Sequence, residues 1–410
     1  MRYLTNHEVA EMYKVSERTV GNWIDYAIEE KVDLQLVHED QREYILNTNH
    51  NHIILTDLSY KSRKYKSKKL KKTIKPKDEF YKIFNEDQII ELINSIESYR
   101  EIPHKFTYFD EGAKYWDRYV NKLAKESNPN ALNNNILLLE KNFEYLLSLI
   151  QDYKKVNVVD LGSGNGLPVK SFIQKLINLK LLNKYIIVDY SKDMAKIAVD
   201  NMRKWFGDDI SIEEEYLDLI YSTFQKTLFV NSNQKDGEEV YANIVILFGD
   251  TPANQRLINL PFVMLNNSMN ATSDILLYSE KLDTKRSRMY FDFASSETNY
   301  CNLDEQERII LDLLNISEDI YEVEAYYDEK EHSRFTKISL KFDINIKFEL
   351  HNFTKTIILL KGDKIITWRG KHQNYTEVMN MMDSTGFNVL HTSRSLDQEQ
   401  LLVISKVKSV

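Results

Sequence analysis

A run of glycines gives the sequence its clearest chemical signal. The stretch VVDLGSGNG, residues 158–166, begins as an apolar run typical of a buried strand and continues into Gly162, Gly164 and Gly166. Glycines in such a turn let the backbone approach a ligand without an intervening Cβ. The G-x-G-x-x-G of nicotinamide enzymes is absent, and Pro168 suits the first position of a following helix. The loop therefore predicts a small-molecule site at a strand end.

Two acidic residues follow at the ends of the next two expected strands, Asp189 in YIIVDYS and Asp218 in EEEYLDL. With GSGNG and the preceding Asp160, they resemble the class I S-adenosylmethionine methyltransferases. The resemblance implies that Asp189 binds the ribose hydroxyls and Asp218 the adenine amino group; Asp160 has an alternative role in stabilising the turn. It also implies S-adenosyl-L-methionine as the cofactor and a cofactor site of Asp160, Gly162, Ser163, Gly164, Gly166, Asp189, Asp218 and Gly249.

The end of the fourth expected strand is where a methyl acceptor would lie. Enzymes that methylate exocyclic amines of bases carry Asp/Asn-Pro-Pro-aromatic there, whereas ILFGDTPANQR, residues 246–256, has a displaced proline and no aromatic residue after it. The stretch is more similar to F-L-G-S-T-I-G-N of the histidine-specific methyltransferase family, which includes the ergothioneine-pathway enzyme that methylates the α-amine of histidine. This resemblance implies that Asn254 holds the substrate amine and that Gly249 lies close to substrate or cofactor.

Two further segments carry the same resemblance, which extends from about 95 to 408. IPHKFTYFDEGA, residues 102–113, is similar to P-P-K-W-F-Y-D-A-x-G-S and places Tyr108 on a substrate-binding tyrosine. In RMYFD, Tyr290 resembles a tyrosine directed at the substrate carboxylate. Asn254 and Tyr108 are thus the candidate catalytic residues. Each also has a structural alternative, because tyrosines often serve packing and Asn254 could cap a helix.

One segment departs from the family. Where its members recognise the imidazole with a Glu and a Ser, ITWRGKH presents Thr367 and Arg369. We therefore expect both to bind substrate, Arg369 by engaging an acidic or carbonyl group, and we expect a substrate other than histidine.

Before these segments, LTNHEVAEMYKVSERTVGNWIDY, residues 4–26, predicts two short helices joined by a tight turn. Thr5 or Asn6 would cap the first helix and Ser16 the second. The pattern resembles a helix-turn-helix of the excisionase or MerR type, with QREYILNT as the wing strand. Two interpretations are open: the second helix enters a DNA major groove, or the domain is a protein-interaction module. The expected inward positions are Val9, Ala10, Met12, Val20, Trp23 and Ile24, and the outward ones Glu17, Arg18, Thr19 and Asn22.

A basic segment follows. Residues 61–77 contain ten Lys and Arg and no acid, so the net charge of −8 leaves −18 for the rest of the chain. The segment lacks apolar periodicity, and Pro76 would stop a helix, which predicts a solvated linker or an extended phosphate-binding arm.

Beyond it, the pattern is helical to about residue 150 and then alternates between apolar strands and helices. We expect an α/β fold with a class I, Rossmann-like methyltransferase sheet. The predicted organisation is 1–58 winged helix-turn-helix-like domain, 59–84 basic linker, 85–150 helical lid, 151–282 S-adenosylmethionine-binding core, and 283–410 β-rich substrate subdomain with the last core strands.

The composition is that of a folded protein. The single cysteine, Cys301, excludes an internal disulfide, no metal site is proposed, and the absence of a long apolar run predicts a soluble cytoplasmic protein without membrane contact. The predicted function is N-methylation of an α-amino acid, peptide or related small amine. The alternatives are a nucleic-acid methyltransferase that reaches DNA through residues 1–77, and a DNA-binding regulator that senses S-adenosylmethionine. The sequence leaves the oligomeric state open.

Overall fold

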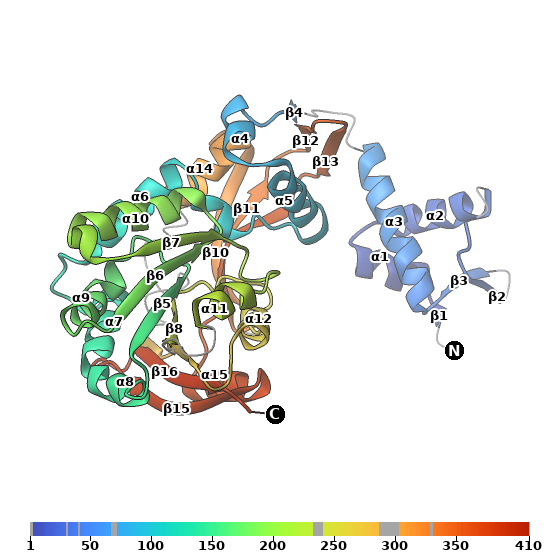
Figure 1. Ribbon diagram of the computed structural model, residues 1–410. Coiled ribbons are helices and arrows are strands. Elements are labelled where there is room, and N and C mark those ends of the chain that lie inside the picture. Colours follow the sequence, from blue (N-terminus) through green and yellow to red (C-terminus); the bar gives the residue numbers. More distant parts are fainter. Residues whose placement is uncertain are drawn as a thin grey trace. The chain divides into compact units, whose positions relative to one another are not determined.

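The computed structural model describes residues 3–29, 32–39, 42–66, 72–232, 241–286, 303–328 and 331–409. These residues form two compact units (Figure 1). One falls within Met1–Ile74, Leu340–Lys347 and Ile358–Asp363, and the other within Lys75–Ser339, Phe348–Ile357 and Lys364–Val410. Within the described ranges, every helix is too short or too polar to cross a bilayer.

The N-terminal part of the first unit packs three helices and a small sheet around one core. α1 (Asn6–Tyr13) and α2 (Glu17–Glu29) are followed by β2 (Leu36–Glu39), β3 (Arg42–Leu46) and α3 (Asn49–Lys66). β3 pairs antiparallel with β2 and with β1 (Tyr3–Leu4). The core consists of Leu4, Val9, Ala10, Val20, Trp23, Ile24, Ala27, Leu34, Ile45, Leu55 and Leu58.

The two N-terminal helices follow the sequence pattern at most positions. Thr5 caps α1 and forms a capping box with Glu8. The predicted positions of two side chains are wrong: Met12 is 53% exposed, whereas Thr19 is buried. Thr19 tolerates burial because its hydroxyl is paired with that of Ser16 at 2.8 Å.

The basic segment is more regular than the sequence predicted. α3 continues to Lys66, so an extended chain is the wrong expectation for residues 60–66. Leu55 and Leu58 of this helix lie in the core, and Lys and Arg extend it readily because their helix propensity is high. β4 (Lys72–Ile74) and α4 (Asp78–Ile83) follow. The winged helix-turn-helix assignment and DNA binding by residues 1–77 stay predictions.

The second unit is built on a seven-stranded sheet of order β15-β16-β9-β8-β5-β6-β7. Its strands are β5 (Lys155–Leu161), β6 (Leu182–Asp189), β7 (Ile212–Tyr216), β8 (Tyr241–Phe248), β9 (Asp274–Lys281), β15 (Phe387–Arg394) and β16 (Gln400–Val407). β5 to β9 are parallel, and β16 runs antiparallel to both of its neighbours. The chain moves outward from β5 to β7 and returns to β8 on the other side of β5. This reversal opens a crevice beyond the carboxyl ends of β5 and β8.

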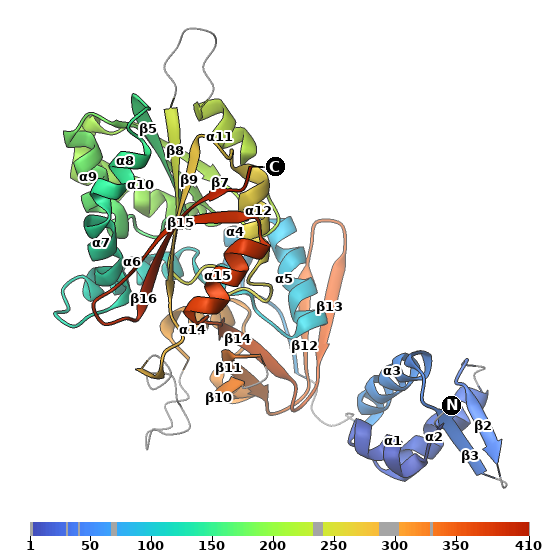
Figure 2. The same cartoon turned by 90° about the horizontal axis from the view of Figure 1, so that it is seen from below.

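Helices cover both faces of this sheet (Figure 2). One face carries α7 (Ala131–Lys141), α8 (Phe143–Leu149), α9 (Lys170–Asn178) and α10 (Lys192–Phe206), and the other carries α11 (Gln225–Ser232), α12 (Leu260–Ser268) and α15 (Tyr375–Ser384). Along β5, Val156 and Val158 pack on the first face, and Val159 and Leu161 on the second. Burial on both sides explains why the strands are almost continuously apolar in the sequence.

The remaining elements come before, between and after the strands of this sheet in the chain. α5 (Glu86–Tyr99), η1 (His104–Thr107) and α6 (Glu111–Leu123) precede β5, η2 (Leu167–Val169) follows β5, and η3 (Gly207–Asp209) precedes β7. After β9 come α14 (Glu305–Leu313), η4 (Glu318–Ile320), β10 (Tyr321–Asp328), β11 (Ser333–Leu340), β12 (Ile344–Glu349), β13 (Thr354–Leu359) and β14 (Lys364–Gly370). β11 and β14 pair antiparallel within the range predicted to be β-rich.

A ladder of buried polar side chains crosses the middle of the sheet. Asn157 donates to Asn243 at 2.9 Å, and Asn243 donates to Asp274 at 2.8 Å. All three are fully buried, and they occupy paired positions on β5, β8 and β9. At the partly exposed end, Asn183 donates to Asn157. The ladder favours one register of these strands, because a shift would leave buried polar groups without partners.

We expect Asn243→Leu to destabilise the second unit by about 2 to 5 kcal/mol, because it strips partners from Asn157 and Asp274. The matched control Asn183→Ala removes one hydrogen bond at the partly exposed end and should lose less than about 1 kcal/mol. Urea unfolding of both variants measures the difference. Equal midpoints would contradict a role for the ladder in stability.

Candidate active site

A cavity of about 550 Å³ lies at the carboxyl edge of the large sheet. It is lined by the ends of β5 to β8, by η1 and α6, and by α14 with side chains from β11 and β14. Its volume falls within the roughly 300–1,000 Å³ of small-molecule sites. The cavity therefore lies where the order of the strands predicts a ligand.

The glycine loop forms one wall. Gly162 and Gly164 line the cavity, with φ of 64° and 56°. A Cβ at Gly162 would lie 3.1 Å from the Thr251 hydroxyl, and one at Gly164 would lie 3.2 Å from Nε1 of Trp116. Side chains at either position would crowd residues that also line the cavity, so the wall has to be bare backbone.

Three residues of the predicted cofactor set do not line the cavity: Asp160, Ser163 and Gly166. The carboxylate of Asp160 instead accepts a 2.5 Å hydrogen bond from the hydroxyl of Tyr185 beneath the loop. Burial raises the pKa of Asp160 to about 7. The side chain of Asp160 thus binds the neighbouring strand β6, and both of its predicted roles, at the cofactor and in the turn, stay predictions.

Asp189 ends β6 and faces the cavity. Its carboxylate accepts a 2.9 Å hydrogen bond from the backbone N–H of Ser191. Burial raises its pKa to about 7, despite that hydrogen bond. The side chain is thus held at the rim and titrates near neutral pH.

Asp218, after β7, also lines the cavity, together with a lysine that the sequence did not single out. Lys105 binds both Asp218 and Glu91, and its ammonium lies 4.3 Å from the centre of the Tyr190 ring. Lys105 belongs to the HKF segment that resembles the family, but its partner Asp218 lies 113 residues away along the chain. The ion pairs attach η1 to α5 and to the end of β7.

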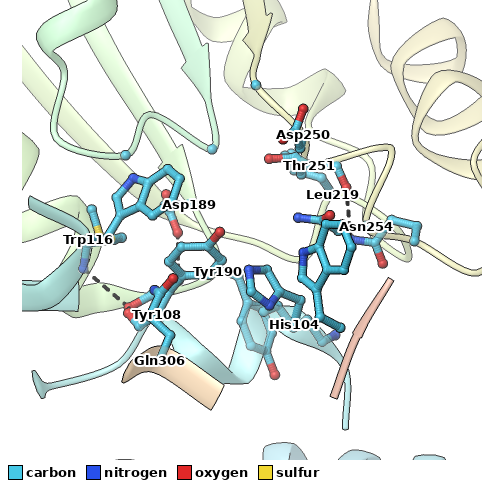
Figure 3. A pocket seen from close by; sticks show the side chains of 18 of the residues that line it. His104, Tyr108, Trp116, Asp189, Tyr190, Leu219, Asp250, Thr251, Asn254 and Gln306 are labelled. Carbon is cyan, nitrogen blue, oxygen red and sulfur yellow. Dashed lines mark hydrogen bonds between the residues drawn. The ribbon is translucent and has the colours of Figure 1, made fainter. Parts of the chain in front are cut away.

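The segment after β8 lies beside the glycine loop and also lines the cavity. In Figure 3, Asp250, Thr251 and Asn254 lie together on one side of the view, with Asp189, Trp116 and Tyr108 on the other. The turn is closed by a 2.9 Å hydrogen bond from the N–H of Asn254 to the carbonyl of Asp250. Oδ1 of Asn254 is buried without a hydrogen-bond partner among the described residues. Asn254 does not cap the next helix, because α12 begins at Leu260.

η1 places two rings in the cavity. The His104 ring lies 5.1 Å from that of Tyr108, which lies 5.5 Å from that of Trp116, all edge to face. The carbonyl of Tyr108 accepts a 2.5 Å hydrogen bond from Ser191, next to Asp189 in space. Burial, reinforced by Asp250, raises the pKa of the Tyr108 hydroxyl, so this group stays protonated.

His104 lies in the cavity as well, although the sequence predicted no role for it. It is 8% exposed, lines the cavity, and has no hydrogen-bond partner at Nδ1 among the described residues. Burial lowers its pKa to about 4, although Asp304 and Asp250 act in the opposite direction. The imidazole is therefore neutral at physiological pH.

The C-terminal candidates behave differently from their prediction. The guanidinium of Arg369 is bound by Glu101 through two hydrogen bonds of 2.8 and 2.7 Å, and Arg369 does not line the cavity. Thr367 does not line the cavity either. Its hydroxyl donates a 2.5 Å hydrogen bond to Glu307, which does line the cavity. Direct engagement of an acidic substrate by Arg369 is therefore the wrong expectation. Tyr290 lies outside the described residues.

Comparison with known proteins identifies the family of this chain. The sequence model of the family described as histidine-specific, S-adenosylmethionine-dependent methyltransferases matches residues 85–406. The chain belongs to this family. It is an S-adenosylmethionine-dependent methyltransferase with a class I sheet, and S-adenosyl-L-methionine is its cofactor. A search of curated proteins finds no match.

Solved structures of other methyltransferases are similar to this chain at low sequence identity. The magnesium protoporphyrin IX methyltransferase of Synechocystis PCC 6803 is 11% identical, with coverage of 78% of this chain and 100% of that one and a TM-score of 0.37. The 1,6-didemethyltoxoflavin-N1-methyltransferase of Burkholderia thailandensis is 7% identical, with coverage of 82% and 94% and a TM-score of 0.36.

The turn that carries His104 and Tyr108 depends on a glycine. A Cβ at Gly112 would lie 1.9 Å from the carbonyl oxygen of Thr107. The side chain of Gln306 donates hydrogen bonds to the carbonyls of Thr107 and Gly112. We expect Gly112→Ala to destabilise the protein by about 3 kcal/mol, because backbone atoms must move. Methyl transfer should fall with it.

Gly21→Ala is the matched control, since a Cβ added to this helical glycine would have no other group within 4 Å. It should be neutral or stabilising by up to about 1 kcal/mol. Thermal unfolding of both variants, followed by methyl-transfer assays, tests the prediction. Unchanged stability of Gly112→Ala would show that the turn is not constrained as described.

Proposed function

We propose that this methyltransferase transfers the methyl group of S-adenosylmethionine to the nitrogen of a small-molecule amine. The observation that carries the proposal is Oδ1 of Asn254, a buried acceptor without a partner among the described residues, at the cavity wall that follows β8. An amine N–H is the kind of donor that satisfies such an acceptor.

The residues at the glycine loop fit the cofactor. We propose that the backbone at Gly162, Gly164 and Gly249 faces it, that Asp189 accepts hydrogen bonds from the ribose hydroxyls, and that Asp218 faces the adenine amino group. When bound, S-adenosylmethionine supplies a methyl group activated by a positively charged sulfur. The support is the bare wall at the loop and the two carboxylates at neighbouring strand ends.

The substrate half has the properties that an amine requires. Methyl transfer needs a free lone pair on nitrogen, so the chain must orient the amine and accept its proton. Asn254 would orient it through an N–H hydrogen bond. The neutral imidazole of His104 is available as a hydrogen-bond acceptor, whereas the protonated hydroxyl of Tyr108 serves as a donor. Alignment by such contacts can lower the barrier by several kcal/mol, with a limit of about 7–11.

Incubation of the protein with methyl-labelled S-adenosylmethionine and a pool of amino acids and small amines identifies the amine that becomes labelled. This amine then serves to test the role of Asn254. We expect Asn254→Ala to lower kcat/KM for that amine about 100-fold, through loss of the orienting hydrogen bond. Affinity for the cofactor, measured by calorimetry, should change less than about twofold.

Asn259→Ala provides the control, because Asn259 is exposed and its side chain makes no cap hydrogen bond. Its kcat/KM should equal that of the parent. Full activity in Asn254→Ala would overturn the assignment of this residue.

The pKa of Asp189 predicts how cofactor binding depends on pH. Because burial raises this pKa to about 7, the carboxylate gains charge, and with it acceptor strength, as the pH rises through 7. We expect the affinity for S-adenosylhomocysteine to increase up to about tenfold between about pH 6 and pH 8 and then to level off. Calorimetry across this range measures it. Asp189→Asn should bind more weakly with a flat profile, and a flat profile in the parent would contradict the ribose contact.

A further inference from the structure

The substrate side of the cavity is acidic. Asp250 follows β8, Asp304 caps α14, and Glu307 lies in the first turn of that helix, and all three line the cavity. Among the described lining residues, Lys105 is the only Lys or Arg, and it is bound to Asp218 and Glu91. Acidic side chains therefore outnumber basic ones among the described residues that line the cavity.

Glu307 is the most enclosed of the three. It is 4% exposed, and its carboxylate accepts hydrogen bonds from the Thr367 hydroxyl at 2.5 Å and from the backbone N–H of Asp304 at 3.0 Å. Both of these donors are neutral. Burial raises the pKa of Glu307 to about 7, and the charge of Asp304 raises it as well. A ligand cation beside Glu307 would remove this unfavourable balance.

A second observation points to the same kind of ligand. His104 is more than nine-tenths buried, lines the cavity, and has no partner at Nδ1 in the described part of the chain, while Asp304 and Asp250 lie close enough to act on it. In the tautomer in which Nδ1 accepts, a ligand N–H would satisfy this atom. A carboxylate at the same place would meet Asp304 and Glu307, with Arg369 already bound to Glu101.

We propose that the methyl acceptor is dibasic: besides the amine that receives the methyl group, it carries a second cationic nitrogen that Glu307 binds. This inference rests on the proposed function and narrows it to one substrate class, which includes basic amino acids and diamines. Thr367 acts through Glu307 as a positioning residue. Glu307 thus determines specificity from α14.

The test compares pairs of amines that differ by one ammonium group. Calorimetry with the S-adenosylhomocysteine complex should show L-lysine binding about 10- to 100-fold more tightly than L-norleucine, and cadaverine more tightly than n-pentylamine by a similar factor. Glu307→Gln keeps the shape of the side chain and should abolish both preferences. Cofactor affinity and thermal stability of this variant verify that its fold is intact.

Glu305→Gln is the matched control on the same helix turn, because Glu305 is exposed and paired with Arg118. It should retain both preferences. Equal binding of norleucine and lysine, tighter binding of L-glutamate or L-histidine than of lysine, failure of both dibasic probes to bind, or an undiminished preference in Glu307→Gln would each overturn the dibasic assignment.

Methyl-transfer assays on the same compounds separate the two proposals. Methylation of norleucine and n-pentylamine as efficiently as of lysine and cadaverine would overturn the dibasic assignment and leave the N-methyltransferase proposal intact. Transfer from S-adenosylmethionine to an oxygen or carbon acceptor, with every amine unreactive, would overturn both.

Discussion

The attachment of η1 to the carboxyl ends of β6 and β7 is the interaction on which the cavity depends. Ser191 donates to the carbonyl of Tyr108 at 2.5 Å, Asp193 accepts from the N–H of Asp110 at 2.8 Å, and Lys105 binds Asp218. The sheet topology alone supplies an open crevice at its switch point. These contacts partly close the crevice, because they hold one aromatic wall beside the glycine loop and the segment after β8.

Burial of the side chains also determines the electrostatics of the site. Burial raises the pKa of Asp189 and Glu307 to about 7 and lowers that of His104 to about 4. Ionised groups with so little contact with water are stabilised by ligands that bring complementary charge or donors. The same property links the two halves of the cavity in our proposal, in which a carboxylate of the cofactor half binds hydroxyl groups and a carboxylate of the substrate half binds a basic nitrogen.

The sequence predicted what is encoded locally. The glycine loop, the strands around it and the acids at strand ends are each recognisable within a few residues, and Gly162, Gly164, Asp189, Asp218, Gly249, Asn254 and Tyr108 all line the cavity. The sequence did not predict contacts between side chains that are far apart in the chain. Arg369 was expected to bind substrate, but Glu101, 268 residues away, binds it instead. The carboxylate of Glu307 escaped notice because α14 reads as an ordinary amphipathic helix with a capping box.

The central claim is that this cavity methylates nitrogen. The most direct measurement is to incubate the protein with S-adenosylmethionine carrying an isotope-labelled methyl group and a cell extract, and then to locate the label in the product by nuclear magnetic resonance. The account predicts a methyl group bonded to an amine nitrogen of a small molecule that still carries a second basic nitrogen. A label found on oxygen, carbon or sulfur would contradict it.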